Sequence, residues 1–246
     1  MYQGWADGLV QLRDIREQDR PAFEAALIER GVTHIVSAGF HPSRDQVPGG
    51  SGFKQVEVYE ASGLHPMAEE AWDFDEWSES VQRSNTRLIG EVGYDKRSLA
   101  TVPWREQYRR AEAALEIAVQ QNASVIWHSV HATERSLAFI ETAHRRGVRG
   151  VWHGFQGSIE TARRVCLHGW MIGLSPTLMS EKSLKLAKVA VELELQSIVI
   201  ESDWPQQFGG YCLDELGAFL AKRRKISSEE LQNQLFMNFF RIVAGL

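Results

Sequence analysis

Short apolar runs alternate with helical patterns along almost the whole 246-residue chain. Seven runs are rich in β-branched or aromatic residues and have turn residues nearby, which is typical of buried strands. They are Thr33–Phe40, Val56–Leu64, Arg87–Val92, Ser124–Trp127, Gly150–Trp152, Trp170–Leu174 and Ser197–Ile200, and a weaker run lies near Gly4–Leu9. The alternation predicts eight parallel strands joined mostly by helices.

Helical patterns fill most of the intervals between these runs. Apolar residues recur every three or four positions over 104–118, 184–195 and 231–242, which predicts three amphipathic helices. The stripes are Trp104, Tyr108, Ala111, Leu115 and Ala118, then Leu184, Ala187, Val191 and Leu195, then Leu231, Leu235, Phe239 and Ile242. A capping box at Ser227-x-x-Glu230 precedes the third helix. The interval 41–55 is rich in Pro and Gly, so we predict a loop there.

The predicted strands read as continuous apolar runs, as expected for parallel strands that are covered on both faces. Eight strand–helix units in about 250 residues fit a closed (β/α)8 barrel. A doubly wound open sheet is the alternative. No linker, low-complexity stretch or shift of composition divides the chain. We therefore predict an α/β fold with a single domain over residues 1–246.

Charge and composition narrow the class of function. The chain has 27 Lys and Arg against 32 Asp and Glu, a net charge of −5, whereas proteins that coat duplex DNA through charge alone are basic. Any contact with nucleic acid must therefore be local. Two cysteines cannot form a disulfide framework, and neither a secretory signal nor a membrane span is visible. We expect a cytoplasmic protein that does not act at a membrane, and the sequence indicates no particular protein partner.

Ionisable residues follow five of the predicted strands: His65, Glu91, His128, His153 and Asp203. The carboxyl ends of parallel strands meet on one face, so these side chains are expected to share one opening. Imidazoles and carboxylates are the ligands of hydrolytic zinc sites, with magnesium or manganese as alternatives. Asp203 would then orient or deprotonate the attacking water. The alternative for any single histidine is a hydrogen-bonded structural role, but packing alone does not explain the whole set.

Five motifs surround these residues. They read Gly63-Leu64-His65-Pro66, Gly90-Glu91-Val92-Gly93-Tyr94-Asp95, Val125-Ile126-Trp127-His128-Ser129, His153-Gly154-Phe155-Gln156-Gly157-Ser158 and Glu201-Ser202-Asp203-Trp204-Pro205. With these motifs in this order, the chain resembles the TatD family of metal-dependent deoxyribonucleases and phosphoesterases over almost its whole length. In the fourth motif, Gln156 stands where the family has Ser. The resemblance implies a (β/α)8 TIM barrel of the metal-dependent hydrolase type.

The resemblance also implies roles for the site residues. Glu91, His128 and His153 would hold one divalent ion firmly, and Glu91 would bridge toward a second ion. Asp203 would be the carboxylate on that other ion and, with Glu91, a catalytic residue. His65 would lie on the substrate side or behind the ligands. The implied reaction is hydrolysis of a phosphodiester bond in single-stranded or short DNA, or in a smaller phosphoester.

The first strand departs from the family pattern. The family has an H-x-H pair there, which supplies two ligands of one ion, and this chain has Leu9 and Gln11 at the corresponding positions. Leu has no donor atom, and the Gln amide is a weak neutral oxygen donor, so the second ion is in question. His41 and His131 are possible partial substitutes. One alternative function is therefore a catalytically impaired barrel that serves as a binding or assembly subunit, and another is hydrolysis of a C–N bond on the same fold.

Further residues near the predicted opening bear on substrate binding. Ser158 stands at a predicted helix start, where backbone N–H groups attract phosphate, although an ordinary helix cap explains it equally well. Trp204 and Trp127 would either stack on bases or pack in the core. His131 is a loop histidine that could reach the opening. We therefore count Ser158, Trp204 and His131, together with His65, as candidate substrate contacts.

Overall fold

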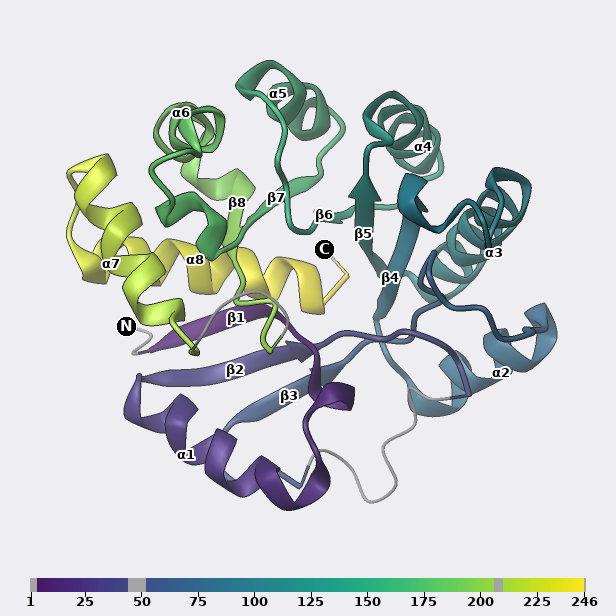
Figure 1. The fold of residues 1–246 in the computed structure, drawn as a ribbon, viewed down its shortest axis with the longest axis horizontal. Helices are drawn as coiled ribbons and strands as arrows, with labels where there is room; N and C mark the ends of the chain where they lie inside the picture. Colours follow the sequence, from purple (N-terminus) through teal and green to yellow (C-terminus); the bar gives the residue numbers. More distant parts are fainter. Residues whose placement is uncertain (1–3, 44–51, 206–209, 246) are drawn as a thin grey trace.

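Eight parallel strands surround a common axis, and most of the connections between them are helices on the outside (Figure 1). The computed structural model describes residues 4–43, 52–205 and 210–245. The strands are β1 Trp5–Val10, β2 Val32–Ser37, β3 Glu57–Glu60, β4 Leu88–Asp95, β5 Ser124–Val130, β6 Gly150–Trp152, β7 Met171–Leu174 and β8 Ile198–Ile200. Each of the eight predicted strands is present, with ends that differ by a few residues.

Hydrogen bonds close the strands into a ring. The strands β1 to β3 pair in sequence order, and so do β4 to β8, with every pair parallel. Ser62, which follows β3, bridges to Ile89 of β4, and Trp204, which follows β8, bridges to Val10 of β1. An open sheet would have two unpaired edges. The closed (β/α)8 barrel is therefore confirmed and the open-sheet alternative is wrong.

The helices that follow the strands cover the outside of the barrel (Figure 1). They are α1 Arg20–Glu29, α2 Phe74–Ser84, α3 Trp104–Gln121, α4 Thr133–Arg145, α5 Ile159–Leu167, α6 Leu184–Glu192 and α7 Leu213–Arg224. A further helix, α8 Ser228–Val243, follows α7 directly. Between β2 and β3 the described residues contain no helix, as expected, although 44–51 lie outside the described part of the predicted loop. Among the described residues, no helix combines the length and apolar character that a membrane span requires.

The predicted stripe on α6 has the wrong phase. Leu184 is 79% exposed and Val191 is 45% exposed, whereas Leu186, Val189 and Ala190 are the buried residues of this helix. The helix is short and carries apolar residues on both candidate faces, so its own sequence does not decide which face packs inward. In α3 and α8 the predicted stripes lie on the buried face: Ala111, Leu115 and Ala118 are buried in α3, and Leu231, Leu235, Phe239 and Ile242 are buried in α8.

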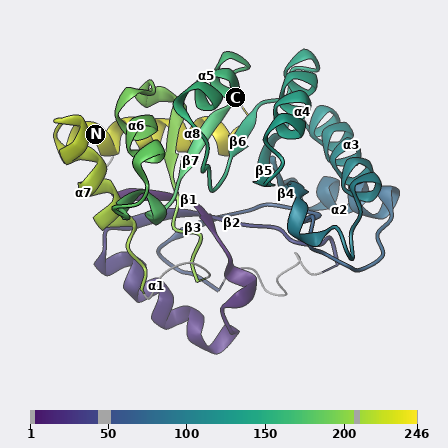
Figure 2. The ribbon, with the colours of Figure 1, turned by 45° about the horizontal axis from the view of Figure 1, so that its top comes forward.

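Helix α8 lies across the amino-terminal end of the barrel (Figures 1 and 2). Its side chains Phe236, Phe239 and Ile242 pack with small and aliphatic residues from the strands in one buried cluster. The amide of Asn238 donates to the carbonyl oxygens of Leu195 and Ile198 (2.8 and 2.6 Å), at the start of β8. Ser227 accepts a hydrogen bond from the amide of Glu230 (3.0 Å), as the predicted cap requires. This end of the barrel is therefore covered, and the opposite end holds the polar residues.

Strands β4 and β5 are longer than predicted because they pair closely beyond the apolar run. Gly93 has a φ of +151°, and a Cβ atom at this position would overlap the backbone carbonyl oxygen of His128. Only glycine fits this approach. The register pairs Gly93 with His128, and the side chains of Glu91 and His128 come within 3.4 Å of each other.

Asp7 on β1 fixes the join between the first and last strands. Its Oδ1 accepts the backbone amides of Leu9 (3.1 Å) and Ser202 (2.8 Å), and its Oδ2 accepts the hydroxyl of Tyr211 (2.8 Å). Burial raises the pKa of Asp7 to about 7, against the effect of these hydrogen bonds. This carboxyl group therefore holds the segments that carry Gln11 and Asp203 side by side.

Candidate metal centre

The carboxyl ends of the strands open into a cleft of about 860 Å³. The five residues predicted to share an opening all line it, namely His65, Glu91, His128, His153 and Asp203. Each is less than 9% exposed. The barrel therefore brings together side chains that are far apart in the sequence, as the strand-end argument expected.

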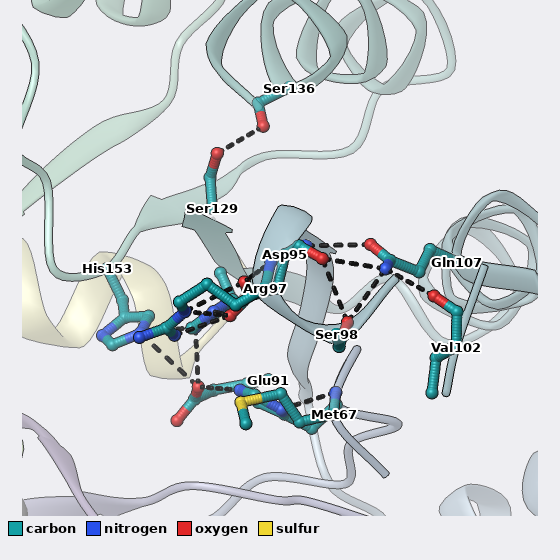
Figure 3. Close-up of polar contacts among 12 residues, drawn as sticks. Met67, Glu91, Asp95, Arg97, Ser98, Val102, Gln107, Ser129, Ser136 and His153 are labelled. Atoms are coloured by element: carbon teal, nitrogen blue, oxygen red, sulfur yellow. Dashed lines mark hydrogen bonds and ion pairs between the residues drawn. The ribbon is translucent and has the colours of Figure 1, made fainter. Parts of the chain in front are cut away.

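The Oε2 atom of Glu91 lies at the centre of a group of imidazoles. His128 Nδ1 and His153 Nε2 are each 3.4 Å from it, and these two nitrogen atoms are 3.3 Å from each other. His65 Nε2 is 3.2 Å from the same oxygen. Figure 3 shows Glu91 pointing toward His153, with dashed lines marking these contacts.

The spacing of the donor atoms fits a divalent ion. Two ligand atoms that are each about 2.1 Å from an ion lie about 3.4 Å apart in a tetrahedral site. The triangle formed by Glu91 Oε2, His128 Nδ1 and His153 Nε2 has edges of 3.4, 3.4 and 3.3 Å. One carboxylate oxygen and two imidazole nitrogens are also a donor set that zinc and similar ions prefer. These three residues therefore match one face of a metal coordination sphere.

Both imidazoles of this triangle contact a carboxylate through their other nitrogen. His128 Nε2 is 3.1 Å from Asp95 Oδ2, and His153 Nδ1 is 3.4 Å from Glu201 Oε1. A carboxylate behind a metal-binding histidine fixes the tautomer and the direction of the ring. The Asp95 contact is a hydrogen bond and leaves His128 Nδ1 free to act as a ligand. The His153–Glu201 contact is an ion-pair distance, and His153 Nδ1 has no hydrogen-bond partner among the described residues.

Asp95 is itself held on two sides. The guanidinium of Arg97 makes an ion pair with its carboxylate (2.6 Å), and the side-chain oxygen of Gln107 accepts its backbone amide (2.8 Å). The amide nitrogen of Gln107 also donates to the carbonyl of Asp95 (3.0 Å), as drawn in Figure 3. On the other side, the backbone amide of Gly154 donates to Glu201, and a Cβ atom at Gly173 would overlap the Glu201 carboxylate. Both supporting carboxylates are fixed in place.

His65 supports Glu91 in a different way. His65, Glu91 and His128 also offer atoms within 4.8 Å of one another, which makes His65 a candidate ligand. However, its Nδ1 accepts the backbone amide of Met67 (3.1 Å), so in the neutral ring the proton sits on Nε2 and points toward Glu91. Burial, followed by the nearby His128, lowers the pKa of His65 to about 4 and keeps the ring neutral. We therefore place His65 behind the ligands, as a donor to Glu91.

The carboxylates make the centre attractive to positive charge. Burial alone would lower the pKa of His153, but the carboxylates of Glu91 and Glu201 raise it to about 10. Burial likewise opposes the charged form of Glu91, yet His153 and His128 hold the pKa of Glu91 well below its usual value. The site thus favours positive charge beside Glu91. Protonated imidazole rings supply this charge, or a metal ion that replaces their protons does.

Asp203 and Gln11 form the other side of the centre. Burial raises the pKa of Asp203 to about 6, and its backbone has a φ of +52°, a conformation rare outside glycine. The side-chain amide nitrogen of Gln11 donates to Asp203 Oδ1 (3.0 Å) and to Glu91 Oε1 (2.6 Å). Leu9 is fully buried and packs with the side chains of the barrel interior.

The remaining predicted contacts lie in different places. His131 is exposed and lines the cleft. The hydroxyl of Ser158 caps α5 by accepting the amide of Thr161 (3.3 Å), and neither Ser158 nor Trp204 belongs to the described lining of the cleft. Trp127 is buried in the core and stacks on a phenylalanine ring. His41 is buried beside Ser43 and lines a separate hollow, so it does not replace a first-strand ligand.

Several residues of the site were not assigned from the sequence. Asp95 and Glu201 both stand inside the motifs, next to predicted ligands, and the need of a metal-binding histidine for a carboxylate partner is the signal that would have identified them. Arg13 and Arg97 also line the cleft. No sequence pattern singles out Arg13, because its position depends on how the chain leaves β1.

Known proteins share sequence and fold with this chain. A sequence profile of the family described as TatD related DNase matches residues 10–244. The chain is 31% identical over 153 residues to the uncharacterized metal-dependent hydrolase YjjV of Escherichia coli, which covers 60% of this chain and 58% of that protein. The chain thus aligns with less than two thirds of that relative.

Two further matches cover a larger part of this chain. The Escherichia coli protein named 3'-5' ssDNA/RNA exonuclease TatD is 25% identical over 197 residues, which covers 76% of this chain and 74% of that protein. The crystal structure of Escherichia coli YjjV superposes with a TM-score of 0.84 at 21% identity and covers 98% of each chain. At that identity the structural match shows a shared fold.

Proposed function

The chain belongs to the TatD-related DNase family of metal-dependent hydrolases, and from this premise we propose that it hydrolyses phosphodiester bonds in single-stranded nucleic acid. The observation that carries the proposal is the triangle of Glu91 Oε2, His128 Nδ1 and His153 Nε2, with edges of 3.3 to 3.4 Å. Each imidazole in it contacts a carboxylate through its second nitrogen. This arrangement supports one firmly held divalent ion.

The mechanism assigns a separate task to each residue. Glu91, His128 and His153 would hold the ion. Asp95 orients the His128 ring through a hydrogen bond, and the Glu201 carboxylate lies 3.4 Å from the His153 ring. A bound divalent ion supplies Lewis-acid polarisation of a phosphoryl oxygen and lowers the pKa of a water molecule beside it. Asp203 orients the attacking water and accepts its proton. Its pKa of about 6 leaves it ionised and able to accept a proton at neutral pH.

Local positive charge in the cleft suits a phosphate-bearing substrate. Arg13 and Arg97 line the cleft, although the chain as a whole carries a net charge of −5. The relative named as an exonuclease acts on single-stranded DNA and RNA, as its name states. A cleft with a few cations binds an exposed strand or its end locally, and His131 is the remaining proposed contact from the loop after β5. Trp204 and Ser158 remain proposed substrate contacts, the latter also as a helix cap.

An assay of substrates and metals tests the proposed function. We expect protein purified without chelator to cleave a single-stranded DNA oligonucleotide and bis(p-nitrophenyl) phosphate. A chelator should abolish the activity, and zinc, manganese or magnesium should restore it, which also identifies the preferred ion. The Glu91→Gln variant serves as the inactive control.

Other outcomes of this assay support the alternatives. No turnover of any phosphodiester, with little bound metal, would favour a barrel that serves as a binding or assembly subunit. Metal-dependent cleavage of cyclic amides but not of phosphodiesters would favour a C–N hydrolase. Either result contradicts the proposed function.

Arg13 is expected to bind a substrate phosphate. Its guanidinium lies 4.6 Å from the centre of the Phe40 ring, which in turn stacks on His65. The Arg13 side chain lines the cleft and is 20% exposed, and its Nε keeps a long contact of 3.7 Å with Asp14. Removing one charge-assisted hydrogen bond costs about 1.5–3 kcal/mol, so Arg13→Ala should raise KM about 10- to 100-fold with little change in kcat.

Steady-state kinetics with the DNA oligonucleotide measure this effect. Arg16→Ala is the matched control, because Arg16 is exposed and pairs with Asp19 (2.6 Å) away from the lining of the cleft. It should leave KM unchanged. An equal KM for Arg13→Ala and the wild-type protein would show that Arg13 does not contact the substrate.

A further inference from the structure

We propose that the side-chain amide of Gln11 takes the place of a second metal ion and makes this centre a single-ion site. The inference rests on the proposed function, because it concerns the same centre. Glu91 has two carboxylate oxygens with different partners. Oε2 faces the imidazoles, whereas Oε1 accepts the amide of Gln11 at 2.6 Å.

The same amide nitrogen also reaches Asp203. Gln11 Nε2 is 3.0 Å from Asp203 Oδ1, so one NH2 group joins two buried carboxylates with one N–H for each. Gln11 is 2% exposed and Asp203 is 4% exposed. A divalent ion between these carboxylates would have to displace the amide. The amide offers the carboxylates partial positive charge without an ion.

The orientation of the amide is determined by these carboxylates. The opposite rotamer would point the amide oxygen of Gln11 at two carboxylate oxygens, which repels. In the observed orientation, Gln11 Oε1 is buried and has no hydrogen-bond partner among the described residues. The protein leaves this acceptor unpaired while both N–H groups are used. This is the arrangement expected if the function of Gln11 is to hold Glu91 and Asp203.

The neighbouring first-strand position provides no ligand that would compensate. Leu9 is fully buried among aliphatic side chains of the barrel interior and has no donor atom. His41 lines a separate hollow, and the nearby imidazole of His153 already faces Glu91 Oε2. The residues present therefore do not fit a second ion, whereas the Glu91, His128 and His153 side fits one.

Metal counting on the purified protein tests the inference independently of activity. The protein is dialysed against excess Zn²⁺ or Mn²⁺, freed of loosely bound ions, and measured by inductively coupled plasma mass spectrometry. We expect one ion per chain for the wild-type protein. We expect two ions per chain for Gln11→Glu, which places a third carboxylate beside Glu91 and Asp203, and for the double variant Leu9→His, Gln11→His.

Gln156→Glu is the matched control. Gln156 lines the same cleft but is exposed, and its amide donates to Thr177 (2.8 Å). This variant should stay at one ion per chain. Electron paramagnetic resonance of the Mn²⁺-loaded proteins gives a second readout, because two ions that share Glu91 couple magnetically and a single ion does not. Circular dichroism establishes that each variant is folded.

The outcomes separate the two proposals. A wild-type count of two coupled ions overturns the inference about Gln11 but leaves the proposed function standing. A count of none contradicts both. The inference is also overturned if the wild-type protein, the folded Gln11→Glu variant and the folded double variant all bind one ion per chain, like the Gln156→Glu control. The amide of Gln11 is then not the group that excludes the second ion.

Discussion

Replacing His128 or His153 by Ala should remove most of the bound metal and lower the rate of hydrolysis at least about a thousand-fold, which corresponds to about 4 kcal/mol of transition-state stabilisation. Both rings belong to the triangle around Glu91 Oε2. With one ring gone, two donor atoms remain, and a hydrolytic zinc site normally has three from the protein. Metal content and initial rate are measured on the same preparation.

His144→Ala is the control for these substitutions. His144 is an exposed imidazole on α4, outside the described lining of the cleft. Its loss should change neither the metal content nor the rate. If His128→Ala and His153→Ala keep full activity with the metal still bound, the triangle does not hold the catalytic ion.

Asp203→Asn should lower kcat about 10²- to 10⁴-fold while the metal count stays at its wild-type value. Loss of a general base typically costs this much, and the amide that replaces the carboxylate retains an oxygen atom that can accept the hydrogen bond from Gln11. The combination of unchanged metal and reduced kcat distinguishes a catalytic residue from a ligand. A parallel loss of metal would instead assign Asp203 to the ion.

The pH profile gives a second measurement on Asp203. Burial raises its pKa to about 6 in the metal-free protein, and a nearby cation can only lower that value. A base must be ionised to accept a proton, so the wild-type rate should fall about tenfold per pH unit on the acid side, starting at or below about pH 6. The residual rate of Asp203→Asn should not show this decrease on the acid side of the pH profile. An unchanged acid limb in the variant would assign the titration to another group.

The gathering of the five predicted residues in one cleft was predictable because it depends on topology. Glu91, His128 and His153 each follow an apolar run, and parallel strands of a barrel must end on one face. That argument predicts that the side chains meet, but not which nitrogen of each ring faces the centre. The direction of the His128 ring depends on its hydrogen bond to Asp95, and the position of Asp95 relative to the ring is set only by the folded strands.

Two details show where local sequence is insufficient. The residues of α6 form two overlapping apolar stripes, and packing in the folded protein buries Leu186 and Val189 rather than Leu184 and Val191. Likewise, Gln11 stands where the related family has a histidine, which indicates a lost ligand. Its two hydrogen bonds to carboxylates more than 75 positions away depend on the closure of the ring between β8 and β1.

Helix α8 has a consequence for how turnover proceeds. Because it covers the amino-terminal end of the barrel and the barrel interior is filled by side chains, the described residues leave the cleft at the carboxyl ends of the strands as the route to the centre. A reaction product that stays bound in this cleft prevents the next substrate molecule from binding. Released phosphate-bearing fragments should therefore compete directly with substrate, and a long strand has to be engaged from outside rather than threaded through the molecule.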